Sequence, residues 1–97
     1  MGIGAKDTEL DYGKRPELAF EDLRQALSAI GKVEEADPEA MFLRGRTRFG
    51  LQRVRIKLRV ASSVHGSTIS IHALADDLWG MGAKKGIDKL ITALEGL

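Results

Sequence analysis

Two segments of the chain repeat apolar residues with the period of an α-helix. Between residues 16 and 30, apolar side chains stand at offsets 0, 4, 7, 8 and 11 counted from Ala19, which places them on one helical face. Pro16 suits the first turn of this helix and Gly31 suits its end. The same offsets recur from Ala83 over residues 83–94, ahead of Gly96. We therefore expect two amphipathic helices, each of which needs a surface to cover.

The middle of the chain alternates apolar and polar residues with the period of a β-strand. Residues 53–60 place an apolar side chain after every cation, and residues 43–49 and 68–73 alternate in the same way. Residues 50–52 and 62–67 have turn composition, which predicts antiparallel hairpins. Residues 32–36 predict a short strand before a turn at Asp37-Pro38. In the alternative, Asp37 caps a helix beginning at Pro38, but the apolar pattern after Met41 does not sustain one.

These elements predict one domain spanning residues 1–97, since a chain of this length builds a single core. The expected fold is an α+β two-layer sandwich. An antiparallel meander of about four strands has one face covered by the two helices, in the order (β)αββββα. Residues 8–12 are a candidate fifth strand, so residues 1–13 form either a first strand or a flexible N-terminus.

Charge is distributed unevenly, although the whole chain carries only +1. Residues 1–39 hold five basic and ten acidic side chains, residues 40–75 hold seven basic and no acidic ones, and residues 76–97 hold three and four. The seven cations fall on the polar side of two neighbouring strands, and we call this set the basic face: Arg44, Arg46, Arg48, Arg53, Arg55, Lys57 and Arg59. Like charges opposed across strands repel, which costs free energy unless an anion, an acidic partner or the acids of residues 1–39 neutralise them.

Three stretches of the chain carry a resemblance: Leu43 to Gly50 (LRGRTRFG), Gly66-Ser67-Thr68, and Trp79-Gly80 ahead of the last helix. They resemble a functionally uncharacterised group of small bacterial α+β proteins. The resemblance covers roughly residues 16–94 and implies a helix, an antiparallel meander and a closing helix introduced by Trp-Gly. The layout is also similar in topology to helix-grip domains of the START and Bet v1 type, which implies a ligand cavity between sheet and C-terminal helix.

The side chains that carry common catalytic and metal chemistry are sparse. The chain has no cysteine, which excludes disulfides, thiolate zinc sites and thiol nucleophiles. His65 and His72 fall in a predicted turn and a predicted strand, which makes a poor metal pair, and no GxSxG motif is present. The glycine run at 80–86 has the spacing GxGxxxG without GK[ST], so we read it as a turn rather than a nucleotide loop. We expect no metal, no cofactor and no enzymatic activity.

The basic face makes a binding or interaction module the leading hypothesis. We expect contact with a protein or a small anionic ligand through the basic face or through the groove between the sheet and the C-terminal helix. Alternatives are nucleic-acid binding by the same arginines and an apolar ligand in a helix-grip pocket. Lys84 and Lys85 form a candidate anion site at the start of the last helix, and Trp79 is a candidate contact aromatic. The sequence shows no membrane span and no signal peptide, so a cytoplasmic location is expected.

Overall fold

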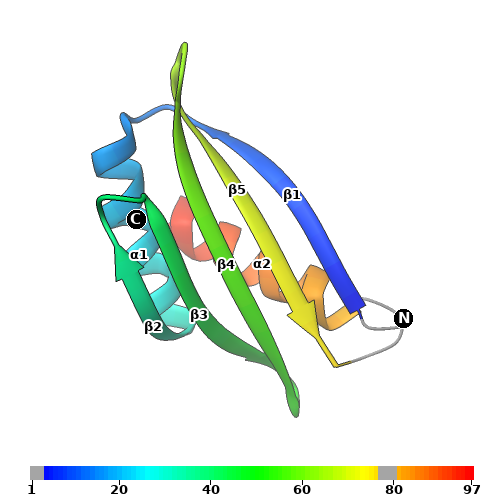
Figure 1. Cartoon of the computed structure of the whole chain (residues 1–97). Coiled ribbons are helices and arrows are strands. Elements are labelled where there is room, and N and C mark those ends of the chain that lie inside the picture. The colour runs from blue at the N-terminus through cyan, green and yellow to red at the C-terminus, as the bar shows by residue number, and fades with distance from the viewer. Residues whose placement is uncertain (1–3, 77–80) are drawn as a thin grey trace.

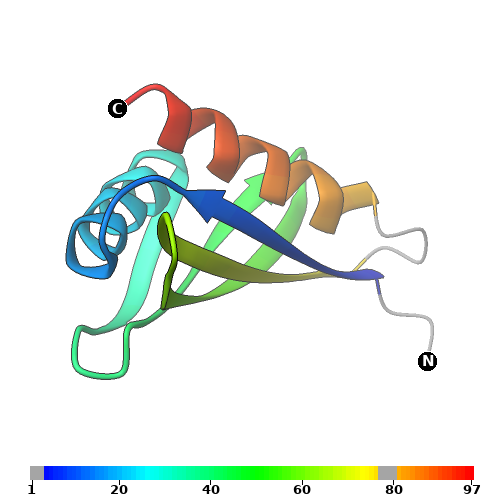
Figure 2. The same cartoon turned by 90° about the horizontal axis from the view of Figure 1, so that it is seen from above.

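The computed structural model describes residues 4–76 and 81–97. The elements in chain order are β1 (Gly4–Tyr12), α1 (Pro16–Ile30), β2 (Gly31–Asp37), β3 (Phe42–Phe49), β4 (Gln52–Ser63), β5 (Gly66–Ala75) and α2 (Met81–Glu95). All neighbouring strands pair antiparallel in one sheet of order β1-β5-β4-β3-β2. Both helices lie behind the sheet in Figure 1 and on one side of it in Figure 2. The predicted two-layer α+β fold is confirmed, with the candidate first strand present.

Helix α1 begins and ends where its sequence predicts. Pro16 occupies the first helical position, where a missing N–H is tolerated, and the Arg15 carbonyl accepts the N–H groups of Leu18 and Ala19. The N–H of Gly31 donates to the Leu27 carbonyl, and β2 follows without a loop. A Cβ at residue 31 would lie 1.9 Å from the Arg46 carbonyl oxygen, so only glycine permits this close approach of α1's end to β3.

The strands of the last hairpin are longer than their apolar alternation predicts. Ser63 pairs with Gly66, so only residues 64 and 65 remain in the turn between β4 and β5, instead of the predicted connection over 62–67. Gly66 has a φ of +136°, a conformation that other residues rarely adopt. Strand β1 pairs with the whole of β5, from Gly4 opposite Ala75 to Tyr12 opposite Ser67. These strands therefore continue, through backbone pairing, beyond the residues that alternate between apolar and polar side chains.

The core lies between the helices and one face of the sheet. Buried apolar side chains come from α1, α2, β3, β4 and β5: Ala19, Phe20, Leu23, Ala26, Leu27, Leu43, Val54, Ile56, Leu58, Val60, Ile69, Ile71, Ala73, Ala75, Ala83, Ile87, Leu90 and Leu94. Gly82, which was predicted to lie in a turn, and Gly86, within the predicted helix, are both buried in α2. A Cβ at residue 86 would lie 2.7 Å from Val54 Cγ1, so this glycine lets α2 pack tightly on β4. No helix among the described residues is long and apolar enough to cross a membrane.

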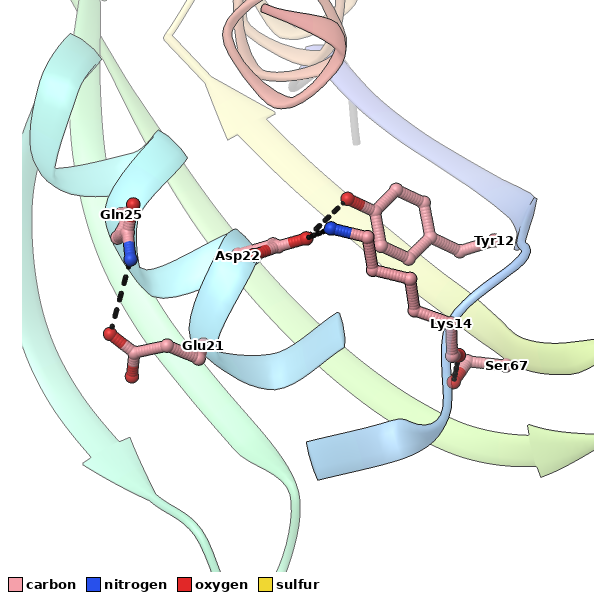
Figure 3. A network of polar contacts seen from close by, with 6 residues as sticks. All are labelled: Tyr12, Lys14, Glu21, Asp22, Gln25 and Ser67. Atoms are coloured by element: carbon pink, nitrogen blue, oxygen red, sulfur yellow. Dashed lines mark hydrogen bonds and ion pairs between the residues drawn. The ribbon is translucent and has the colours of Figure 1, made fainter. Parts of the chain in front are cut away.

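A small polar network fastens the end of β1 to α1 (Figure 3). The Tyr12 hydroxyl and Lys14 Nζ donate to Asp22 Oδ2 at 2.6 and 2.8 Å, and Ser67 Oγ donates to the Lys14 carbonyl at 2.6 Å. Burial, and then the hydrogen bond to the Asp22 carboxylate, raises the pKa of Tyr12 to about 12. Hydrogen bonds from Lys14 and Tyr12 lower the pKa of Asp22. The network joins β1, β5 and α1 on the side of the sheet away from the basic face.

Candidate functional site

The face of the sheet without helices carries the seven predicted cations on two of its three inner strands, β3 and β4. The register opposes like charges in three successive pairs: Arg44 with Lys57, Arg46 with Arg55, and Arg48 with Arg53. Side chains directly opposite on antiparallel strands have Cβ atoms about 4.5–5.5 Å apart, so each pair repels at close range. The structure thus brings all seven residues onto one open surface, which faces the viewer in Figure 1.

Strand β2 supplies carboxylates to one side of the basic face. Glu34 and Glu35 lie 3.3 Å from Arg44, and Glu34 also lies 3.6 Å from Arg46. Consecutive strand residues normally point to opposite faces, but the register shifts between Val33 and Glu35. This β-bulge lets both glutamates reach the same arginine. The acids of residues 1–39 were one candidate for neutralising the basic face. Two of them, Glu34 and Glu35, form ion pairs with Arg44 and Arg46.

Strand β1 supplies carboxylates to the other side, across β5. Asp7 lies opposite His72, which lies opposite Lys57, and Asp7 Oδ1 is 2.6 Å from His72 Nδ1. One row further along, the Arg59 guanidinium lies 4.9 Å from the centre of the Phe42 ring, a cation–π distance. A surface hollow of about 590 Å³ lies in this region, lined by Asp7, Thr8, Glu9, Phe42, Lys57, Arg59, Ser70, Ile71 and His72. This end of the sheet therefore presents both signs of charge.

Four cations of the basic face have no such compensation. Across residues 4–76 and 81–97, no ion pair involves Arg48, Arg53, Arg55, Lys57 or Arg59, and of these five only Arg59 has a ring contact, with Phe42. A second hollow, of about 570 Å³, is lined by Glu34, Arg44, Arg46, Leu51, Arg53, Arg55, Leu74 and Asp76. The positive charge is thus concentrated toward the end of the sheet where β3 turns into β4, near Asp76 at the end of β5.

Lys84 and Lys85 lie on α2, in the helical layer, and so apart from the basic face. Lys84 and Lys85 are exposed on α2, and Lys84 Nζ is 3.5 Å from Asp88 Oδ2, one turn later in the helix. Residues 77–80, which precede α2, lie outside the described part of the chain, and Trp79 is among them. The structure therefore does not bring Lys84 together with the seven cations.

The surroundings of the chain's two histidines bear on hydrolytic and metal chemistry. The Asp7–His72 pair has the form in which a carboxylate orients an imidazole. In the described structure, however, no serine or threonine hydroxyl bonds to the His72 ring, and no three His, Asp or Glu residues gather as a metal site. His65 is exposed in the β4–β5 turn.

The space between sheet and helices is occupied by packed side chains. Leu23 and Leu90 from the helices are 0% exposed, and Leu58 from the sheet is 1% exposed. The hollows bordered by described residues open on the surface. A helix-grip ligand pocket therefore receives no support from the packing.

Comparisons with known proteins extend to the fold and no further. No protein-family model matches the chain, and no curated protein matches it in sequence. Protein MLL2253 from Mesorhizobium loti has a similar structure, with a TM-score of 0.67, 14% identity, and coverage of 95% of this chain and 94% of that one. Protein CV1439 from Chromobacterium violaceum gives a TM-score of 0.55 at 12% identity and covers 97% and 96%. Both are bacterial structural-genomics targets described without an activity, which is consistent with an uncharacterised group of this fold.

Proposed function

We propose that this chain is a small non-enzymatic binding module whose basic face docks an acidic protein segment or a small anionic ligand. The supporting observation is the cluster of four cations, Arg48, Arg53, Arg55 and Lys57, that have neither an ion pair with a described carboxylate nor a ring contact. Each opposed like-charged pair costs roughly 0.2–1 kcal/mol in the free protein. An anion bound over β3 and β4 would remove that repulsion, so its binding is favoured by the way the sheet is built.

The arrangement of the acids favours a compact anion over a long phosphate backbone. A polyanion lying across the strands would leave β3 and β4 and meet Asp7 and Glu9 on β1, and Glu34 and Glu35 on β2. Sequence-tolerant binding of single strands also uses open aromatic rings for base stacking. On the basic face the nearby ring is Phe42, which Arg59 covers.

The groove beside α2 is a less favourable docking place for an anion. A hollow of about 570 Å³ lies there, lined by Ile30, Phe49, Lys85, Asp88, Lys89, Thr92 and Ala93. Its mixed charge and apolar walls give an anion fewer partners than β3 and β4 do.

Binding to a labelled glutamate-rich peptide, followed by fluorescence anisotropy at low salt, tests the proposal. The double variant Arg53→Gln/Arg55→Gln should bind about tenfold more weakly or worse, since charge-assisted contacts contribute about 1.5–3 kcal/mol. Lys6→Gln/Lys84→Gln removes the same net charge from exposed positions outside the basic face and should bind nearly as the parent does. Equal losses in both double variants, or no binding by the parent, would overturn docking of an acidic protein segment on the basic face.

The competing function, nucleic-acid binding, is tested with the same variants. Duplex affinity should then fall linearly on a log–log plot against salt, with a slope near −0.9 per neutralised phosphate. An oligonucleotide that binds more tightly than the peptide, with this slope and with sensitivity to Arg53 and Arg55, would replace an acidic partner by nucleic acid.

A further inference from the structure

We infer that one end of the basic face holds a site for a phosphate monoester. A hollow of about 400 Å³ lies there, which we call the basic hollow, lined by Ile30, Gly31, Lys32, Arg46, Arg48, Arg53 and Lys89. Five of these seven residues are cations and none is acidic. Its volume is at the lower end of the range for small-molecule sites, about 300–1,000 Å³. The inference rests on the proposed function, because three of the five cations belong to the basic face.

The cations reach the basic hollow from four separate elements. Lys32 of β2 lies opposite Arg46 of β3, and Arg48 of β3 lies opposite Arg53 of β4. Lys89 comes from α2, in the helical layer. Charges on a single solvated helix are clustered by local sequence alone. Here the tertiary structure brings cations from distant parts of the chain around one hollow.

Lys89 is held at the basic hollow by the backbone rather than by an acid. Pairing between β2 and β3 begins at Gly31 opposite Thr47, so β3 runs past the start of β2. Lys89 Nζ donates to the Arg48 carbonyl at 3.0 Å, beyond the last of these pairs. An ammonium group has three N–H donors, so two remain for a ligand.

The charge of the basic hollow suits a group with about two negative charges at one point. Among the described carboxylates, only Glu34 forms an ion pair with one of its five cations, at 3.6 Å from Arg46. A phosphate monoester carries about −1.5 to −2 and three acceptor oxygens. Guanidinium groups such as those of Arg48 and Arg53 can bind two of its oxygens, and lysine ammonium groups act as point charges. A phosphodiester or a single carboxylate carries only one charge and would use fewer of these cations.

Titration of ¹⁵N-labelled protein with phosphoserine, with glutamate as the matched carboxylate ligand, tests the site by NMR. We expect amide shifts centred on Gly31, Lys32, Arg48 and Lys89, and affinity for phosphoserine well above that for glutamate. Inorganic phosphate should bind at the same residues, which separates recognition of the phosphate from recognition of the amino acid.

Variants locate the binding energy. Lys32→Gln and Lys89→Gln should each weaken phosphoserine binding by about tenfold, the effect of a lost contact of about 1.4 kcal/mol. Arg55→Gln removes the same charge from the basic face outside the basic hollow and should have a much smaller effect. Within residues 4–76 and 81–97 the Lys32 side chain makes no hydrogen bond or ion pair, so Lys32→Gln keeps the test valid if Lys89→Gln disturbs folding.

The two proposals fail in different ways. Shifts spread along β3 and β4, an equal loss in Arg55→Gln, or equal affinity for glutamate would overturn the phosphate site and leave the acidic-partner function standing. Phosphoserine binding in the basic hollow without any binding of the glutamate-rich peptide would instead overturn the docking of an acidic protein segment and keep the site as one for a small anion.

Discussion

Tyr12 shows how a single side chain reports on the joint between the first strand and the first helix. Its hydroxyl donates to Asp22, which also accepts from Lys14, and its ring lies 5.9 Å from the Lys14 ammonium. Nothing in the alternation of the sequence singled out this trio. Its members are close because the chain passes almost directly from the end of β1, at Tyr12, into α1, which begins at Pro16.

The raised pKa of Tyr12 predicts a specific loss of stability in alkali. A folded-state pKa of about 12, against 10.0 ordinarily, means that the fold favours the protonated hydroxyl. This contribution to the free energy of unfolding is fully present below pH 10 and is lost as the pH rises from 10 to 12. Tyr12→Phe should therefore lose less stability than the parent across that window in urea unfolding measured at several pH values. Parallel curves for the two proteins would contradict the assignment, and tyrosine absorbance can be followed directly because Tyr12 is the chain's one tyrosine.

At the scale of elements, hydrophobic periodicity predicts which side of a helix or strand is buried and where the periodic segment begins and ends. It identifies α1 with its observed ends and the cationic and apolar sides of β3 and β4. It gives only part of β1, since Gly4, Ala5 and Lys6 show no alternation and join the sheet through backbone pairing with β5. It also misses the bulge in β2, because a period of two places Glu34 and Glu35 on opposite faces.

The two faces of β4 should respond oppositely to substitution. Val54 and Ile56 are 0% exposed, so Val54→Asp or Ile56→Asp buries a carboxylate without a partner and should unfold the protein. Lys57→Ser on the open face should change the free energy of unfolding by no more than about 0.5 kcal/mol. Circular dichroism and urea titration give the comparison, and similar damage from both kinds of variant would mean that the buried face is assigned wrongly.

The cations of the candidate site differ in how far the sequence predicts their positions, because only some of those positions follow from local alternation. The seven cations of the basic face follow from alternation within two strands. The position of Lys32 beside the basic face depends on the register of the β2–β3 hairpin. The Asp37-Pro38 turn predicts that hairpin but does not determine its register. Lys89 lies on the exposed side of α2, and no local pattern connects it to Arg48, 41 residues away in the chain. Contacts between layers depend on packing, which periodicity does not encode.

At the scale of the whole molecule, charge is arranged in bands across the sheet. The cations occupy β3 and β4, while carboxylates on β1 and β2 flank them. The acidic surplus of residues 1–39 and the basic surplus of residues 40–75 are therefore neighbours in space and partly neutralise one another. The cations that remain without an ion pair repel one another and so lower the stability of the free protein. The same cations are the groups that would bind an anion.

This opposition between stability and anion binding can be measured at Arg55, which lies directly opposite Arg46. Arg55→Glu replaces repulsion by attraction and should raise the free energy of unfolding by about 0.2–1 kcal/mol, while weakening the glutamate-rich peptide's binding. Arg55→Gln, which removes only the repulsion, should fall between the parent and Arg55→Glu in urea unfolding. A destabilised Arg55→Glu variant would mean that the cations do not repel one another in the free protein.

The carboxylates on β1 and β2 have a second consequence, because these are the two edge strands of the sheet. An edge strand offers unpaired N–H and C=O groups to any other extended chain, and charged side chains and bulges discourage that pairing. β1 presents Asp7, Glu9 and Asp11, and β2 presents its bulge with Glu34 and Glu35. The acids that temper repulsion in the centre therefore also protect both margins against strand addition. Removing them to strengthen anion binding would leave the edges more open to self-association.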